Sequence, residues 1–223
     1  MSHFNPAFLD FFKSLAANNH KEWFDENRSI YEKEVKEPFK KFVQLVILQI
    51  AKKYPEFQGL EAKDCIFRIN RDIRFSKDKT PYKTQVSAVV APEGKKSKAI
   101  NGVYFELSPE HVRVYGGIYE LDKDDLYFIR EGITENLDTF QKLYRDKTFV
   151  KLFGELLGEK NKVLPKEFQA YIDQEPLILN KQWYFYAQFP AEEVLKEDLD
   201  QTILHCFEVG RPIEQFFNQL IKR

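Results

Sequence analysis

The first quarter of the chain carries apolar residues at helical spacing. A short amphipathic helix is expected over residues 4–17, and a longer one over about 20–53. Asn19, followed by Glu22 three residues later, predicts the cap between the two helices. Pro38 lacks a backbone donor, so we expect a kink or a break in the long helix shortly before it.

The apolar period changes from helical spacing to alternation at about residue 65. In the segment CIFRINRDIRFS, Phe67 and Ile69 alternate with Arg68 and Asn70, and the alternation continues to the end of the segment. This pattern predicts a strand with one apolar and one polar face. Turn residues follow. Four further strands are expected at 85–91, 103–107, 112–115 and 183–189.

Helical spacing returns in the second half of the chain, where Asp122 is expected to cap the first helix and Pro212 to lie in the first turn of the last one. Consecutive strands joined by short turns imply an antiparallel sheet. We therefore predict the α+β class, with a central, mostly antiparallel sheet of about five strands flanked by N-terminal and C-terminal helices. The chain has no internal repeat, and we expect a single domain over residues 1–223. Its expected parts are a helical region at 4–54, a sheet at about 65–118 plus 183–189, and helices at about 122–158. A last helical region is expected at about 191–222, as two helices at about 191–208 and 212–222.

Charge is balanced over the whole chain but concentrated in one segment. The 223 residues include 34 Lys and Arg and 35 Asp and Glu, for a formal charge of −1. That balance argues against bulk attraction to nucleic acid. The segment RINRDIRFSKDKTPYKT, residues 68–84, nevertheless holds six basic residues and two acids. This cluster indicates a site for negative charge.

Composition excludes several classes of protein. Hydrophobic residues make up 43% of the chain, which excludes a largely disordered polypeptide, and 21 Phe indicate a core built on phenylalanine. Cys65 and Cys206 have no metal-ligand spacing, so we expect no metal, and no motif gives a reason to expect a cofactor. The sequence shows no secretory signal and no apolar run long enough to cross a bilayer. We therefore expect a soluble, cytoplasmic protein without membrane contact.

Basic side chains on the predicted strand and turn could bind a small anion. On the polar face of the strand, Arg68 and Arg74 flank Asp72, and guanidinium groups grip planar anions through two parallel hydrogen bonds. Arg71 falls in the apolar phase, so it requires a bulge or an acidic partner from a helix. The alternative is a solvated face with surface ion pairs of little energetic value. The candidate ligand-binding residues are Arg28, Arg68, Asn70, Arg71, Asp72, Arg74, Lys77, Lys79, Tyr82 and Lys83.

Arg28 lies between Phe24 and Tyr31 on one stripe of the long helix. An arginine on a packing face either extends to water or joins a polar network. Because Asn27 lies beside it, we favour a network that includes Asp72.

The polar faces of the other strands contain residues suited to acid/base chemistry. Alternation groups Tyr104 with Glu106 on one strand, and His111 with Arg113 on the next. If these side chains share a face with Asp72, then Asp72 and Glu106 are the candidate carboxylates and Tyr104 or His111 the candidate proton carriers. The alternative is a wet sheet face. The sequence leaves open whether the protein is an enzyme.

Three stretches of the chain resemble the domain of unknown function 2461 family. They are NNHKEWFDENRSIYEKEVKEPF, FRINRDIRFSKDKTPYKT and GGIYELDKDDLYFIREGI. The resemblance covers nearly the whole chain and supports the fold class and the choice of residues, while the name of the family implies no reaction. The matching positions are Trp23, Phe24, Asn27, Arg28, Tyr31, Arg68, Asn70, Arg71, Asp72, Arg74, Phe75, Lys79, Pro81, Tyr82, Lys83, Gly117, Tyr119 and Arg130.

Three functions follow from these observations. The first is a pocket for a phosphorylated or carboxylated small molecule, which predicts that four arginines (Arg28, Arg68, Arg71 and Arg74) converge on one cleft. The second is a nucleic-acid-binding module, which predicts an exposed basic stripe with Phe75 and Tyr82 available to stack on bases. The third is an interaction or scaffold protein, which predicts that every arginine is paired with a protein acid and that no pocket is open. The sequence does not indicate the oligomeric state.

Overall fold

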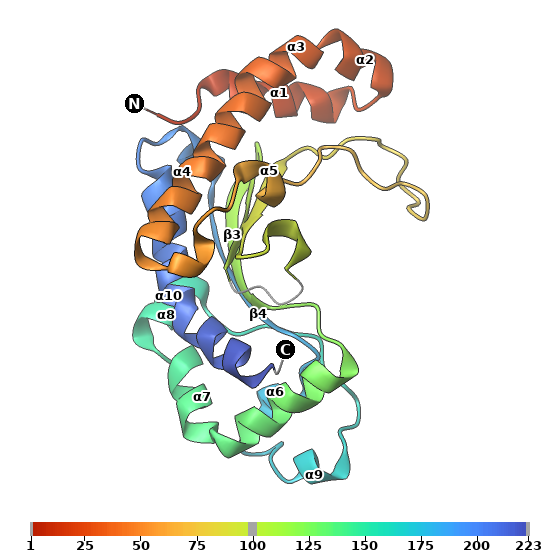
Figure 1. Ribbon diagram of the computed structural model, residues 1–223. Helices are drawn as coiled ribbons and strands as arrows, with labels where there is room; N and C mark the ends of the chain where they lie inside the picture. Colours follow the sequence, from red (N-terminus) through yellow and green to blue (C-terminus); the bar gives the residue numbers. More distant parts are fainter. Residues whose placement is uncertain (1, 98–101, 222–223) are drawn as a thin grey trace. The chain divides into compact units, whose positions relative to one another are not determined.

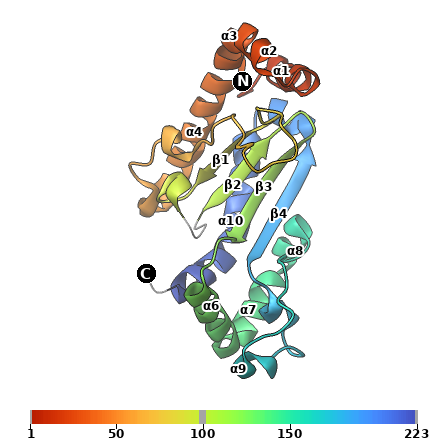
Figure 2. The ribbon, with the colours of Figure 1, turned by 90° about the vertical axis from the view of Figure 1, so that its right-hand side faces the viewer.

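The computed structural model describes residues 2–97 and 102–221 (Figure 1). Within these residues the strands form one antiparallel sheet in the order β1-β2-β3-β4 (Figure 2). The predicted α+β class is confirmed, with four strands where about five were expected. The strands are β1 (Val86–Val90), β2 (Val103–Leu107), β3 (His111–Ile118) and β4 (Trp183–Pro190).

Helices occupy both ends of the chain, as the apolar spacing predicts. The first group consists of α1 (Pro6–Ala17), α2 (Lys21–Glu26), α3 (Arg28–Ile30), the π-helix η1 (Tyr31–Lys36), α4 (Glu37–Lys53), the 3₁₀ turn η2 (Pro55–Phe57) and α5 (Ala62–Cys65). The short 3₁₀ turn η3 (Gly94–Lys96) follows β1. The second group consists of α6 (Lys123–Glu135), α7 (Leu137–Tyr144), α8 (Lys147–Phe153), α9 (Lys166–Gln169), the 3₁₀ turns η4 (Pro176–Leu179) and η5 (Ala191–Leu195), and α10 (Leu199–Leu220).

The chain divides into two compact units. The first comprises Met1–Lys95, Tyr104–Val114 and Gln188–Leu204, and the second comprises Lys96–Val103, Tyr115–Ala187 and His205–Arg223. Each unit is described by itself below. The expectation of a single domain over residues 1–223 stays a prediction.

Phenylalanine forms the core of the first unit. Phe39 and Phe42 of α4 meet the ring of Phe105 in β2, with centroid distances of 6.0 and 5.9 Å. Because side chains alternate along a strand, Phe105 faces α4 while Tyr104 and Glu106 lie on the opposite face. That face is where the sequence places the candidate acid/base residues.

The single helix expected over about 20–53 is divided: α2 ends before Asn27, a break that was not expected, and the hydrogen bonding changes again before Pro38. The π-helix η1 ends at Lys36, and α4 begins at Glu37 with Pro38 in its first turn. A proline has no N–H, and its ring clashes with the carbonyl four residues earlier in a regular helix. The wider π turn absorbs this irregularity. The expected irregularity before Pro38 is confirmed.

Residues 66–84 form a segment that we call the basic hairpin. A strand was expected from about residue 65 to residue 75, and this prediction is wrong. Ile66 and Asn70 make only isolated antiparallel bridges, to Ala88 and Tyr82 respectively. The hairpin is the long loop that follows α5 in Figure 1.

Two local features end the pairing of the hairpin arms. The N–H of Arg71 donates to the carbonyl of Pro81 at 2.9 Å, but Pro81 has no N–H with which to continue the ladder. Further out, Phe75 is 94% exposed, so the apolar alternation has no surface to bury against. The alternating pattern alone could not show this, since burial decides whether alternation becomes a sheet.

In the second unit, a glycine of β3 lies against α10. Gly117 has a φ of +101°, and a Cβ atom there would lie 2.3 Å from the carbonyl oxygen of Trp183, so only glycine fits. Its N–H donates to Oε1 of Glu214 at 3.1 Å. Glu214 is fully enclosed, and burial raises the pKa of its carboxyl group to about 8, against the lowering effects of the Gly117 N–H and of Arg211.

The C-terminal helices differ from the prediction. α10 is one helix with Pro212 inside it, where two helices with a break before residue 212 were expected. An internal proline costs about 3 kcal/mol. Ile213 and Phe217 continue the buried apolar stripe beyond the proline, and this burial offsets the cost. Residues 191–195 form η5 instead of the start of a helix, and residue 222 lies outside the described residues.

The middle helices largely follow the prediction. Asp122 caps α6, as expected, since its carboxylate accepts from the N–H groups of Asp124 and Asp125 at 3.0 and 2.9 Å. The helical region expected to end at about residue 158 ends at Phe153. Gly154 follows with a φ of +78°, a conformation that ends helices.

Replacement of Glu214 by Gln should make the protein more stable at alkaline pH. The folded protein binds a proton at Glu214 up to its pKa of about 8, whereas the unfolded chain releases it near the ordinary pKa of 4.5. Between these values the folded state holds more protons, so the wild type loses stability as pH rises. Urea unfolding at pH 5 and pH 8 should show that the advantage of Glu214→Gln grows by about 3 kcal/mol over this interval.

Glu167 is exposed, so Glu167→Gln is the matched control. Its effect on the free energy of unfolding should be the same at pH 5 and pH 8. An advantage of Glu214→Gln that is the same at both pH values would mean that Glu214 does not titrate in this interval.

Candidate functional site

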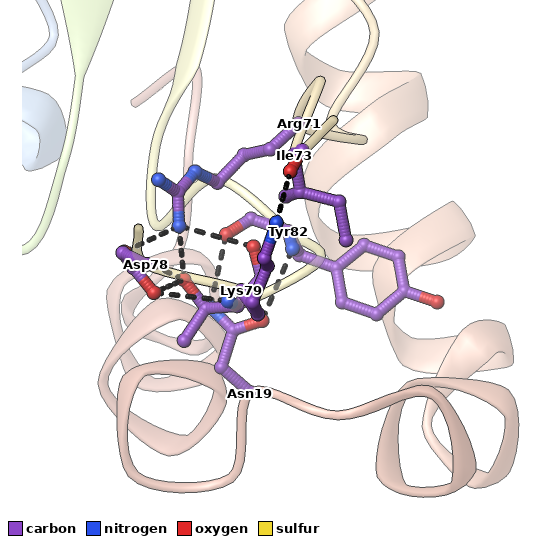
Figure 3. Close-up of polar contacts among 7 residues, drawn as sticks. Asn19, Arg71, Ile73, Asp78, Lys79 and Tyr82 are labelled. Carbon is purple, nitrogen blue, oxygen red and sulfur yellow. Dashed lines mark hydrogen bonds and ion pairs between the residues drawn. The ribbon is translucent and has the colours of Figure 1, made fainter. Parts of the chain in front are cut away.

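Asn19 clamps the basic hairpin to the N-terminal helices of the first unit. Its Nδ2 donates to the carbonyl of Tyr82 at 2.9 Å, and its Oδ1 accepts from the N–H of Tyr82 at 3.1 Å (Figure 3). The side chain therefore pairs with the backbone in the way a neighbouring strand does. The predicted capping box is wrong, because His20 is the N-cap of α2 and its Nδ1 accepts from the N–H of Trp23.

Tyr82 adds an aromatic contact to this clamp. Its buried ring stacks on Phe24 with a centroid distance of 4.1 Å and an interplanar angle of 16°. Arg28 lies over Phe24, with its guanidinium carbon 5.3 Å from the ring centroid, and pairs with Asp25 at 2.5 Å. The predicted network between Arg28 and Asp72 is therefore wrong, since the neighbouring acid one helical turn away takes the guanidinium.

Arg71 finds its acid within the hairpin, whereas the sequence suggested either a bulge or an acidic partner from a helix. Its Nη1 donates to Oδ2 of Asp78 at 2.5 Å, to the carbonyl of Thr80 at 3.0 Å and to the Thr80 hydroxyl (Figure 3). Within the described residues, Nε and Nη2 of Arg71 have no hydrogen-bond partner. The edge of the guanidinium that suits a bidentate acceptor is thus available.

The acids of the hairpin are held as carboxylates by their neighbours. The N–H of Thr80, the guanidinium of Arg71 and the Thr80 hydroxyl keep the pKa of Asp78 below its usual range. The guanidinium and the N–H of Arg74 do the same for the pKa of Asp72. Arg74 donates to Asp72 from Nε at 3.0 Å and from Nη2 at 2.6 Å, so both donors of its bidentate edge are engaged.

An open pocket of about 600 Å³ lies between the end of α1 and the basic hairpin. Of the ten candidate ligand-binding residues, only Arg71, Asp72, Tyr82 and Lys83 line it. The four arginines expected to converge on one cleft do not do so, because Arg28 and Arg74 are drawn to local acids. The candidates that do not line the pocket are Arg28, Arg68, Asn70, Arg74, Lys77 and Lys79. The complete lining consists of Ala16, Asn19, Arg71, Asp72, Asp78, Thr80, Tyr82, Lys83, Thr84 and Gln85.

Lys83 is the second basic group of the pocket. Its ammonium lies over the ring of Phe67 at 5.4 Å, and in the described part of the chain it forms no ion pair. Burial and the nearby Arg68 lower the pKa of Lys83, and Glu106 opposes this effect. Lys83 and Arg68 therefore repel each other, and a bound anion reduces this repulsion.

Glu106 gathers the polar groups of the adjoining sheet face. Its carboxylate accepts from Gln85 at 2.7 Å and from Tyr104 at 3.1 Å. It also lies 3.2 Å from Nε2 of His111 and 3.6 Å from Nη1 of Arg113. Tyr104, Glu106 and His111 thus meet on one face, whereas Asp72 pairs with Arg74 instead of joining them. Their role in acid/base chemistry stays a prediction.

Several residues of the site could not be picked out by sequence reasoning. Asn19, Thr80 and Thr84 line the pocket but have no distinctive spacing, and Asp78 was interpreted only as a turn residue. The Asn-Asn pair between α1 and α2 was the one available signal for Asn19, because only one of the two can cap a helix.

Metal binding and membrane crossing can both be judged for the described residues. In residues 2–97 and 102–221, no group of three or more His, Cys, Asp or Glu side chains is placed to hold a metal ion. None of the helices in this part of the chain has the length and apolar character needed to cross a membrane.

Comparison with known proteins gives one match. A family model described as "Conserved hypothetical protein (DUF2461)" matches residues 7–216. No curated protein and no solved structure matches the chain.

Replacement of Glu106 by Ala should destabilise the protein strongly. Glu106 is 7% exposed, and its removal takes one buried acceptor away from the polar groups around it, although Arg113 keeps its bond to Gln188. Removing one partner from a buried charged network typically costs about 3–5 kcal/mol. Urea unfolding should show a loss in this range, and Glu106→Gln should recover part of it because the amide oxygen still accepts hydrogen bonds.

Asp72→Ala is the control, since it removes an exposed acid with a single side-chain partner. Equal effects of the two alanine variants would show that the Glu106 cluster is no more than a solvated face.

Proposed function

The chain belongs to the domain of unknown function 2461 family, and we propose that it binds a small anion with a carboxylate or phosphate group in the pocket between α1 and the basic hairpin. The free edge of the Arg71 guanidinium carries this proposal. Asp78 and Thr80 hold Nη1, and Arg71 lines the pocket, so we infer that Nε and Nη2 offer a fixed fork to a ligand there. Such a fork matches the two oxygens of a carboxylate or phosphate.

Preorganisation supports tight binding at this fork. Arg71 is held by its bonds to the turn, and its side chain is 27% exposed, so little conformational freedom is lost when a ligand arrives. Lys83 supplies a second charge from the same pocket, and its three donors can rotate toward a ligand.

The charge balance indicates a ligand of low charge. Asp72 and Asp78 also line the pocket, and Arg74 pairs with Asp72 from outside it. Arg71, Lys83 and Arg74 therefore exceed the two acids by one positive charge. A monoanionic carboxylate matches this excess most closely, and a phosphate monoester, with about 1.5 to 2 negative charges at pH 7, matches it better than a polyphosphate does.

Neutral polar groups can recognise the remainder of the ligand. The hydroxyl of Thr84 and the side-chain carbonyl oxygen of Gln85, which makes no hydrogen bond among the described residues, provide a donor and acceptors around the fork. The scaffold alternative requires that no pocket be open and that every arginine be paired. The open pocket and the absence of an ion pair for Arg68 among the described residues count against it.

A thermal-shift screen tests the proposal. Acetate, malonate, inorganic phosphate, sulfate and a sugar phosphate are each titrated at low and high salt. A ligand at a hundred times its dissociation constant adds about 2.7 kcal/mol, which raises the melting temperature of a chain of this size by about 5–10 °C. At least one of these anions should give such a shift, and the shift should persist in high salt because the fork is partly buried.

Variants of Arg71 identify the site. Arg71→Ala should abolish the shift, and Arg71→Lys should weaken it, since a lysine keeps the charge but loses the fork. Lys77→Ala, which removes an exposed basic residue of the same hairpin that does not line the pocket, should keep it. The proposal fails if no anion of the panel stabilises the protein, or if the Arg71 variants respond as the wild type does.

A further inference from the structure

The tip of the basic hairpin exposes a complete aromatic ring. Phe75 is 94% exposed, more than any other large apolar residue in the described part of the chain. The guanidinium carbon of Arg74 lies 5.7 Å from the centroid of the ring. Phe75 contributes nothing to the core or to the pocket, so its exposure has no structural cause within the first unit.

The hairpin that carries this ring has more basic groups than acids. The basic hairpin contains six basic residues and two acids, an excess of four positive charges in a chain whose total is −1. Both acids are already paired, Asp72 with Arg74 and Asp78 with Arg71. Lys77 and Lys79 are exposed, and neither forms an ion pair within the described residues; Lys79 donates only to the carbonyl of Ile73 at 2.9 Å.

A second group of the same kind lies nearer the base of the hairpin. Lys83 lies over the ring of Phe67, and the exposed Arg68 forms no ion pair in the described part of the chain. Cations and aromatic rings therefore alternate from the base of the hairpin to its tip. This combination is typical of surfaces that bind single-stranded nucleic acid, in which bases stack on rings and phosphates meet Lys and Arg.

We propose that the basic hairpin binds single-stranded nucleic acid, with a base stacked on Phe75 and phosphates held by Lys77, Lys79 and Arg68. Tyr82, the other aromatic residue that the sequence offered for stacking, is buried against Phe24 and takes no part. A duplex does not suit the tip, because the faces of paired bases are covered by their neighbours.

The apolar surface of the tip is too small for a membrane. Phe75 is its one fully exposed apolar side chain, since Ile73 is half-buried. Stable membrane attachment by a surface segment needs a larger apolar area together with a larger basic cluster. A single ring followed within four residues by two lysines suits one nucleotide better than a lipid surface.

Fluorescence anisotropy with a labelled twelve-nucleotide oligo(dT) tests the proposal. The wild type should bind it at 50 mM salt and bind the duplex of the same length much more weakly. Phe75→Ala should weaken binding by about 5- to 150-fold, the range measured for loss of a base–aromatic stack. Phe75→Leu should weaken it similarly, because leucine is apolar but cannot stack, and Phe75→Trp should retain it.

Salt dependence measures the phosphate contacts. Each phosphate neutralised on a single strand contributes about −0.7 to the slope of log K against log salt, so three contacts give about −2. Lys77→Gln combined with Lys79→Gln should reduce the magnitude of the slope by about 1.4. Leu48→Ala, which alters an exposed apolar residue on α4, should change neither affinity nor slope.

Three results would overturn the proposal. They are no binding by the wild type, equal affinity of the wild type and Phe75→Ala, and binding that Phe75→Leu keeps while the protein also sediments with vesicles of phosphatidylserine and phosphatidylcholine. The last result would assign the tip to an anionic membrane surface. Since Phe75 is almost fully exposed, its variants should unfold in urea as the wild type does, which separates loss of binding from loss of folding.

Discussion

The position of the basic hairpin depends on the pairing between the Asn19 side chain and the backbone of Tyr82. A hairpin joined only by isolated bridges is marginal by itself, and here one amide supplies the two hydrogen bonds that a neighbouring strand would have supplied. The stack of Tyr82 on Phe24 excludes water from these bonds and fixes the approach of the hairpin to α1 and α2. Asn19 and Ala16 form one side of the pocket, so the pocket exists only where this pairing holds.

Pairing within the hairpin, and not its count of basic residues, determines which charges a ligand can meet. Arg74 forms an ion pair with Asp72, and Arg28 forms one with Asp25. Arg71 is only partly engaged, because Asp78 and Thr80 bind Nη1, while Nε and Nη2 have no partner among the described residues. The six basic residues thus act as a small number of available donors, and this difference decides what class of anion the pocket suits.

The sequence could predict the elements whose burial follows a single period. The helical stripe of α4 and the alternation of β2 and β3 follow directly from burial on one face, and so does the grouping of Tyr104, Glu106 and His111. Prediction failed where a contact distant in sequence or a loop acid decided the outcome. Packing carries α10 through Pro212, and Asp25 and Asp78 capture arginines that spacing alone would assign elsewhere. Periodicity contains no information about which rotamer reaches which acid.

The pocket and the tip can bind different partners because they use different atoms of the same hairpin. The pocket uses the inner edge of Arg71 and the ammonium of Lys83, both near the clamp formed by Asn19, whereas the tip uses Phe75 and Lys77, beyond the last backbone bond between the arms. A ligand on Nε and Nη2 of Arg71 leaves Nη1 bound to Asp78, so the turn that supports the tip keeps its bonds. Since a ligand shifts a conformation only through differential contacts, occupation of the pocket has no direct means of moving the tip. Coupling between the two would pass through Lys83, which lines the pocket and lies near Arg68, one of the residues proposed to hold the nucleic acid.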